Sequence, residues 1–357
     1  MRRSKNRPYS RRAFLAGTGA VAAGLTVAPR FGWGAEEAKL NFYNWDTYIG
    51  EDTLDDFEDA SGIEVKMDLF ADNDELFAKL KEGNPGYDVI VPTNDFVERM
   101  ITADMLVPLD HSKIPNFKAN VDQAFQEAEF DPGRKFSMPY MWGTMGIGYR
   151  KSKVSGVPDS WKHVFDSDEY SGKIAWLSEI TLETTLKYLG YSLNSTDTNH
   201  IKQAEELLIK QKPHVKTVAE DNGQDLLLAG EVDLAMEWNG DILQVMAEDD
   251  DLSYVVPKEG SLVWQDTLCI PKGAPHPENA HRFIDFILDA KVGAEIADFI
   301  QYATPNKAAK ALLAADYTEN PAIFPSPETL ARCEAELYQG EELQRVKDEV
   351  WTRVLAS

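Results

Sequence analysis

The chain has 357 residues and a formal net charge of −24 at pH 7, with 60 Asp and Glu against 36 Lys and Arg. Such a surface repels nucleic acid and anionic membranes and attracts cations, so we expect a small cationic ligand and no nucleic-acid partner. The two cysteines, Cys269 and Cys333, are too few for a disulfide framework and lack metal-ligand spacing, and the six histidines are scattered. We expect no metal site and no cofactor.

Residues 1–35 predict an export signal. They contain seven Arg or Lys and no acid, and the pair Arg11 and Arg12 precedes a short apolar run rich in Gly and Ala. This order is typical of the twin-arginine route to the periplasm, with a disordered basic tail as the alternative, and the run is too short to span a membrane. Cleavage is expected near Gly34–Ala35, which changes the formal charge to −31 and leaves about 320 residues, enough for two lobes.

In the exported part, strand and helix signals alternate along the chain. Strands are predicted at residues 39–44, 63–70, 87–92, 143–150, 172–177, 232–238, 252–257 and 266–271. Helices are predicted at residues 51–62, 72–83, 95–105, 200–211, 278–290 and 292–301. Strands separated by helices favour an α/β fold with parallel sheets that are covered on both faces.

Ligands of such sheets bind where the carboxyl ends of the strands meet. The stretch at residues 41–50 places Tyr43, Trp45 and Tyr48 around the acid Asp46 at the end of the first strand. An aromatic ring beside a carboxylate recurs after the strand at 232–238 and in the residues at 264–266. The candidate site residues are Trp45, Asp46, Tyr48, Thr93, Asp95, Trp238, Asp241, Trp264 and Asp266, together with Tyr302, which comes just after the predicted helix at 292–301.

Aromatic rings with nearby carboxylates are typical of a site for an organic cation with a hydrocarbon body. Ring faces contact methylene groups and attract an ammonium group with roughly 0.5–2 kcal/mol each. Carboxylates accept charge-assisted hydrogen bonds from the same group. Several such contacts together reach micromolar affinity, about −8 kcal/mol. For each tryptophan taken alone, the alternative is ordinary packing in a core or an interface.

A secreted hydrolase is the competing class. The chain has no GxSxG, P-loop or HExxH motif, and the three glycines within residues 143–150 lack the dinucleotide-binding spacing. Paired carboxylates also serve glycosidases. A ferric-ion binder would need adjacent tyrosines, which the chain lacks. A receptor for an amino-acid-like zwitterion would need a basic residue in its cleft, and Arg150 is the nearest candidate.

The sequence resembles the polyamine-binding proteins of bacterial ABC importers, the spermidine/putrescine receptors, over nearly all of residues 39–355. The motifs that carry the resemblance are FYNWDTYI, YDVIVPTNDFVERM, MPYMWGTMGIGY, WNGD, VPKEGSLVWQDTLCIP and YATPNKAA. The resemblance implies a non-catalytic periplasmic protein with the two-lobed type II binding-protein fold. Such a protein closes over its ligand and delivers it to a permease in the inner membrane, and we expect it to be a monomer.

The resemblance also implies roles for single residues. The aromatic box corresponds to Trp45, Tyr48, Trp238, Trp264 and Tyr302, the amine-binding carboxylates to Asp241 and Asp266, and a hydroxyl contact to Thr93. The pair Asp46–Thr47 departs from the family order by one position, and Asp95 stands where some relatives carry an aromatic residue. The family acid before residues 181–191 aligns on Ile180. We assign its role to the adjacent Glu179, with Glu183 one turn further on.

The two lobes are expected to be discontinuous in sequence. We predict one lobe from residues 37–141 and 266–310, and the other from residues 142–265 and 311–357. The ligand cleft would then lie between them.

Overall fold

The computed structural model of the chain describes residues 36–178 and 180–357. The expected export signal with Arg11 and Arg12, its cleavage site and Glu179 lie outside this part of the chain. None of the described helices is both long enough and apolar enough to cross a lipid bilayer.

Nine strands and fifteen α-helices are present in the described residues. The strands are β1 (Lys39–Asn44), β2 (Glu64–Leu69), β3 (Val89–Ile90), β4 (Ser137–Arg150), β5 (Ile174–Leu177), β6 (Val215–Ala219), β7 (Leu234–Trp238), β8 (Leu252–Val255) and β9 (Val263–Cys269). The helices are α1 (Thr53–Ser61), α2 (Asn73–Lys81), α3 (Asn94–Thr102), α4 (Pro115–Asn120), α5 (Lys162–Phe165), α6 (Thr181–Tyr188), α7 (Thr198–Gln211), α8 (Gly223–Leu228), α9 (Asn239–Met246), α10 (Pro277–Ile287), α11 (Ala290–Ile300), α12 (Lys307–Lys310), α13 (Ala315–Thr318), α14 (Pro327–Leu330) and α15 (Glu341–Leu355). Short 3-10 helices are η1 (His111–Lys113), η2 (Gln123–Phe125), η3 (Pro132–Arg134) and η4 (Lys212–His214).

Local sequence signals explain the helix ends that were predicted. The helix α1 stops at Gly62, whose φ of 73° suits glycine and whose N–H donates to the carbonyl of Glu58. The helix α2 starts at Asp72, whose carboxylate accepts from the N–H of Glu75 at 2.7 Å. The structure adds the strand β6 and several helices to the predicted elements, among them α4, α9 and α15.

All nine strands join in one sheet with the order β2-β1-β3-β9-β4-β7-β5-β6, and β8 also pairs with β4. The prediction of parallel pairing is confirmed for β1 with β2 and β3, and for β5 with β6 and β7. It is wrong in the middle of the sheet, where β4 pairs antiparallel with β7, β8 and β9, and β3 with β9. The reason is that β4 carries the chain from one half of the sheet to the other and β9 carries it back.

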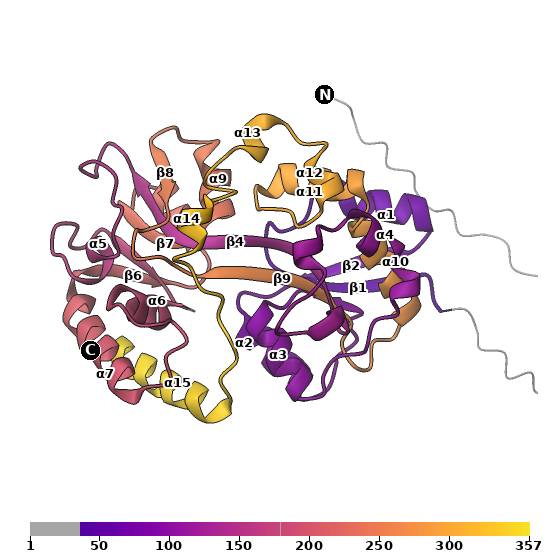
Figure 1. Ribbon diagram of the computed structural model, residues 1–357, viewed down its shortest axis with the longest axis horizontal. Helices are drawn as coiled ribbons and strands as arrows, with labels where there is room; N and C mark the ends of the chain where they lie inside the picture. The colour runs from indigo at the N-terminus through magenta and orange to yellow at the C-terminus, as the bar shows by residue number, and fades with distance from the viewer. Residues whose placement is uncertain (1–35, 179) are drawn as a thin grey trace, which may run out of the picture. The chain divides into compact units, whose positions relative to one another are not determined.

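Figure 1 shows β4 and β9 side by side across the middle of the fold. The ladder between them runs from the pair Ser137 and Cys269 to the pair Thr144 and Val263. The predicted lobe boundaries at residues 141/142 and 265/266 fall on neighbouring rungs of this ladder, because Met141 faces Asp266 and Trp142 faces Gln265. The division into these segments stays a prediction.

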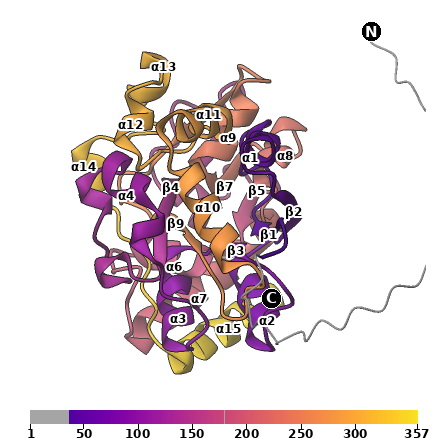
Figure 2. The ribbon, with the colours of Figure 1, turned by 90° about the vertical axis from the view of Figure 1, so that its right-hand side faces the viewer.

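Helices cover both halves of the sheet. Around β1 and β2 lie α1, α2, α3, α4 and α10, and Figure 2 looks at this half from its end, where α10 packs on β1. Around β5 to β8 lie α5, α6, α7 and α9, and the C-terminal α15 packs against α7. The buried rings of Phe42 and Phe283 meet edge to face at 5.0 Å in the first half, and Trp161 and Trp176 are fully buried in the second.

A buried carboxylate anchors the start of β4. Asp131 is 1% exposed, and its oxygens accept from the N–H groups of Lys135, Phe136 and Ser137 at 3.1, 2.9 and 2.8 Å. The hydroxyl of Ser137 donates to the same side chain at 2.8 Å. Because hydrogen bonds to a charged group are strong, Asp131 fixes the entry of the chain into the strand that crosses the sheet.

We therefore expect Asp131→Ala to lower the free energy of unfolding by about 3 kcal/mol, since the buried donors of Phe136 and Ser137 then lose their acceptor. Urea unfolding followed by tryptophan fluorescence measures the loss. The control is Asp122→Ala, which removes an exposed carboxylate that accepts from one N–H at 2.9 Å and should cost about 1 kcal/mol or less. Equal stabilities of the two variants would contradict this role for Asp131.

Candidate ligand-binding site

One cavity is lined by residues from both halves of the sheet and holds about 850 Å³ of space free of protein atoms, including its open mouth. It brings together ten of the eleven residues that the sequence predicts for the site. They are Trp45, Asp46, Tyr48, Thr93, Asp95, Trp238, Asp241, Trp264, Asp266 and Tyr302. The eleventh, Glu179, lies outside the described residues. Ile180 and Glu183, which follow it, line the cavity.

The loop after β1 supplies one wall. The indole N–H of Trp45 donates to the carbonyl of Val91 at 2.9 Å, which fixes the ring at the end of the neighbouring β3. The carbonyl of Tyr48 accepts from the side chains of Asn44 at 3.0 Å and Tyr140 at 2.8 Å, so the ring of Tyr48 is held in the cavity. Asp46 is exposed at the rim and accepts from the N–H of Thr47.

Tyr43 does not belong to this wall. Its ring is 1% exposed and stacks on Tyr87 at 4.2 Å, within the hydrophobic core of the first half. Alternation along the strand explains the difference, because successive side chains of a strand point to opposite faces. The rings of Trp45 and Tyr48 leave the strand and turn into the cavity, whereas that of Tyr43 remains with the core.

Asp266 of β9 is held between the two halves. It is 6% exposed, and its Oδ1 accepts from the hydroxyl of Thr93 at 2.9 Å. The amide of Asn73 donates in turn to the Thr93 hydroxyl at 2.8 Å and accepts from the Thr93 N–H at 3.2 Å. These contacts orient the carboxylate before any ligand arrives.

Asp241 lies on the opposite wall, in the first turn of α9, directly after Trp238 at the end of β7. Asn239 fixes this corner, since its side chain donates to the carbonyl of Ala322 at 3.0 Å and accepts from the N–H of Thr144 at 3.1 Å. Asp241 is 9% exposed and receives a hydrogen bond from Tyr302.

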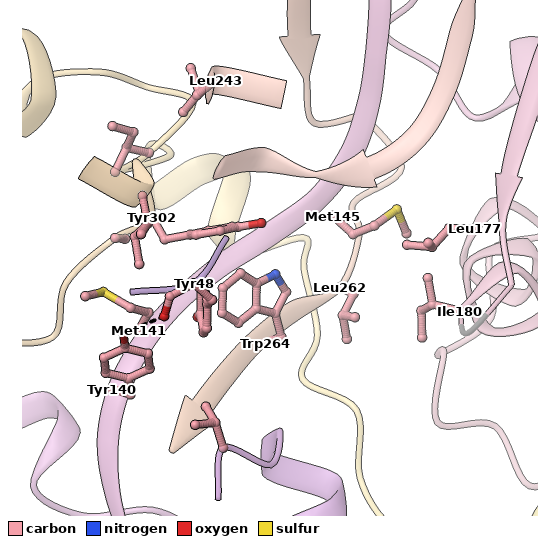
Figure 3. Packing of buried hydrophobic residues seen from close by; sticks show 14 of the residues in the cluster. Tyr48, Tyr140, Met141, Met145, Leu177, Ile180, Leu243, Leu262, Trp264 and Tyr302 are labelled. Carbon is pink, nitrogen blue, oxygen red and sulfur yellow. Dashed lines mark hydrogen bonds between the residues drawn. The ribbon is translucent and has the colours of Figure 1, made fainter. Parts of the chain in front are cut away.

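Aromatic rings gather in the cavity, and Figure 3 shows those of Tyr48, Trp264 and Tyr302 next to one another. The ring of Tyr302 lies 5.1 Å from that of Trp264 and 5.3 Å from that of Tyr48, both nearly perpendicular to it, and Trp238 meets Trp264 at 6.0 Å. Glycine makes this close packing possible, because a Cβ on Gly240 would lie 2.6 Å from the Tyr302 ring. The rings are thus fixed in an edge-to-face cluster.

The cavity is strongly acidic. Eight carboxylates line it, and no Lys, Arg or His is among its described lining residues. They are Asp46, Asp74, Asp95, Glu183, Asp221, Asp241, Asp266 and Glu336. Burial removes water from these groups and raises the pKa of Asp95, Asp241 and Asp266 to about 7 each. A bound cation would stabilise the charged forms of these carboxylates, which burial has deprived of water.

Behind Asp241 lies a further carboxylate, Glu237, which is fully buried. Burial raises its pKa well above the usual value, and Asp221 and Asp241 raise it further by repulsion. One oxygen from each of these three acids lies within 4.8 Å of the others. Such a group accepts hydrogen bonds from an ammonium ion. It is incomplete for Ca²⁺, which takes 6–8 oxygen ligands.

Several lining residues were not predicted. Asp221 follows β6, a strand that sequence patterns did not indicate, and Glu336 and Gln344 belong to a C-terminal segment without a site motif. Asp74 lies in the first turn of α2, where an acid has an ordinary structural reason. The candidate for a zwitterion site, Arg150, lies elsewhere, since its guanidinium donates to the carbonyls of α8 and pairs with acids before β8.

Comparisons with known proteins agree with this architecture. Residues 52–325 match the family model of the bacterial extracellular solute-binding proteins. The chain is 34% identical to the putrescine-binding periplasmic protein PotF of Escherichia coli, over 94% of this chain and 96% of that one. It is 33% identical to the spermidine/putrescine-binding periplasmic protein of the same organism, over 88% of this chain and 90% of that one.

A solved structure shows the same fold. The spermidine/putrescine ABC transporter substrate-binding protein PotD of Streptococcus pneumoniae superposes with a TM-score of 0.77 at 32% identity, covering 89% of this chain and 98% of that one. The prediction of a two-lobed α/β binding-protein fold is thereby confirmed. These relatives are solute-binding proteins of transporters and not enzymes. The chain belongs to the family of bacterial extracellular solute-binding proteins.

Proposed function

We propose that the protein binds a short aliphatic polyamine in the periplasm and delivers it to the permease of an ABC importer. The observation that carries the proposal is the pair of buried carboxylates, Asp266 and Asp241, on opposite sides of an aromatic cluster. Among the described residues that line this cavity, none is basic. Protonated amines supply the missing positive charges. The relatives named above, a putrescine-binding and a spermidine/putrescine-binding protein, support the same ligand class.

In the proposed complex, the ammonium groups bind Asp266 and Asp241, and the methylenes lie between Trp45, Trp264 and Tyr302. Each part of the site then meets a matching part of the ligand, because the rings attract the cation and cover its hydrocarbon body. An exposed ion pair contributes only about 0–1 kcal/mol. Burial of the amine by closure of the two lobes, divided as predicted above, is therefore part of the proposal.

The two other candidate functions have less support. A zwitterion needs a basic group for its carboxylate. Arg150 lies at the last position of β4 and forms ion pairs with Asp249 at 3.0 Å and Asp251 at 3.3 Å. A hydrolase would use the raised pKa of a cavity carboxyl as a general acid, yet the family consists of binding proteins.

The proposal also includes the compartment of the protein, its export route and its partners. The periplasmic relatives support the same compartment for this chain. We assign its export to the twin-arginine route, and we expect a monomer that meets an inner-membrane permease and, with its negative charge, avoids nucleic acid.

The first prediction concerns Asp266→Asn. Removal of one buried charge should weaken putrescine binding at least tenfold, since an unpaired buried ammonium costs about 2–5 kcal/mol. Isothermal titration of protein freed of bound amines by unfolding and refolding measures the change. The control, Asp250→Asn, alters an exposed acid away from the cavity and should bind as wild type. Absence of heat with any amine at millimolar concentration would refute the proposed ligand class.

The second prediction is a pH dependence. Because the pKa values of Asp95, Asp241 and Asp266 are raised to about 7 in the ligand-free fold, their neutral forms stabilise it below pH 4, and this contribution is lost as pH rises through 7. A bound diamine favours the charged forms. The rise in melting temperature with putrescine should therefore grow from pH 5.5 to 8, and binding should release protons near pH 7.

Affinity should fall by up to about tenfold per pH unit below 7 for each carboxylate that must ionise. The amine itself stays protonated over this range, since ammonium groups titrate near pH 10. Asp266→Asn removes one of these carboxylates and should flatten the profile. A ligand-induced shift of the same size at all pH values in the wild type would contradict the assignment.

The third prediction concerns export. Replacement of Arg11 and Arg12 by Lys should leave the precursor in the cytoplasm, as cell fractionation and immunoblotting would show. The matched control replaces Arg2 and Arg3 by Lys and keeps export. Wild-type periplasmic levels of the first variant would rule out the twin-arginine route.

A further inference from the structure

A buried lysine lies behind the wall of the candidate site, next to two acids that line the cavity. Lys347 of α15 is 6% exposed, and its ammonium lies 3.0 Å from Oε1 of Glu183 and 3.9 Å from Oε1 of Glu336. Both acids line the cavity. Burial works to lower the pKa of Lys347, but the two carboxylates outweigh it and raise the pKa to about 12, so the side chain is charged at neutral pH.

The lysine reaches this position from the side of a second cavity. That cavity is lined by Lys347 and shares Asp74, Glu183 and Gln344 with the candidate site. Lys347 also acts on Asp95, whose pKa is raised by burial and lowered by the lysine charge. The ammonium of Lys347 therefore sits between the two cavities and faces three acids of the candidate site.

Within residues 36–178 and 180–357, the positive charges that pair with acids of the cavity lie on one side of it. Asp74 pairs with Arg99 at 3.0 Å, and Glu183 and Glu336 face Lys347. No such partner contacts Asp266 or Asp241 in the described part of the chain, where uncharged groups donate to them: Thr93 and Tyr48 to Asp266, and Tyr302 and Gln244 to Asp241. The acids on the first side thus have a cation of the protein, and those on the second side lack one.

We propose that Lys347 acts as a built-in ammonium group, which occupies the place that a third ligand ammonium would take and makes the site selective for diamines over triamines. The inference rests on the proposed polyamine function and adds the ligand's charge. A diamine fills the positions at Asp266 and Asp241. A triamine would bring its additional ammonium against Lys347, where like charges repel. Lys347 is a specificity-determining residue in this assignment.

The test replaces the charge of Lys347 while keeping its length. In Lys347→Met, the buried carboxylate of Glu183 loses its cation, and only a ligand with an additional ammonium can replace it. We expect wild-type protein to bind putrescine at least tenfold more tightly than spermidine. In Lys347→Met, spermidine should gain at least tenfold, with putrescine changed by less than threefold.

Two further variants separate this effect from loss of an ion pair. The double variant Glu183→Gln with Lys347→Met removes both charges, so it avoids an unpaired buried acid and should show no gain for spermidine. Lys210→Met removes an exposed lysine that pairs with Asp166 at 2.8 Å, and should leave both affinities unchanged. Circular dichroism confirms that each variant is folded.

Isothermal titration with putrescine, spermidine and 4-aminobutyrate gives the three affinities for each variant. Equal weakening of both amines in this variant would show a purely structural role and overturn the inference, with the proposed function intact. If 4-aminobutyrate binds the wild type more tightly than either amine, both the inference and the proposed function fail.

Discussion

A carboxylate taken out of water needs a positive partner, and this requirement governs the candidate site. Asp266 and Asp241 are nearly buried, and burial brings the pKa of each to about 7. The protein supplies hydroxyl groups of Thr93 and Tyr302 to them and leaves the positive charge to the ligand. An empty site of this kind is held in a less stable state than the filled one, so a cation that enters also stabilises the fold.

The strands β4 and β9, which cross the sheet, determine where the buried carboxylates lie. Asp266 lies in β9 opposite Met141 of β4, where the chain passes between the two halves, and Thr93 of the first half bridges to it. Asp241 and Trp238 come from the second half. A ligand that binds both carboxylates therefore connects the two halves of the sheet at the place where they join, which suits a hinged binding protein.

The same cavity shows two ways to stabilise buried acids. On one side, Lys347 pairs with the buried Glu183, and Arg99 pairs with the exposed Asp74. On the other side, the acids depend on a ligand. A buried pair that is broken by removing one partner is strongly destabilised, so each internal cation also limits which external cations fit. Selectivity between related amines can in this way depend on residues that do not contact the common part of the ligand.

The sequence by itself predicted most of the strands, several of the helices and ten of the residues that gather in the cavity. Strand ends followed by rings and acids predicted Trp45, Trp238 and Asp241 as neighbours, because alternation and the carboxyl-edge rule are local properties of α/β sheets. Only the tertiary structure decided that the centre of the sheet is antiparallel, that Tyr43 belongs to the core, and that Lys347 lies beside Glu183. These features join residues far apart in the chain, and local patterns carry no information on which distant partners a side chain meets.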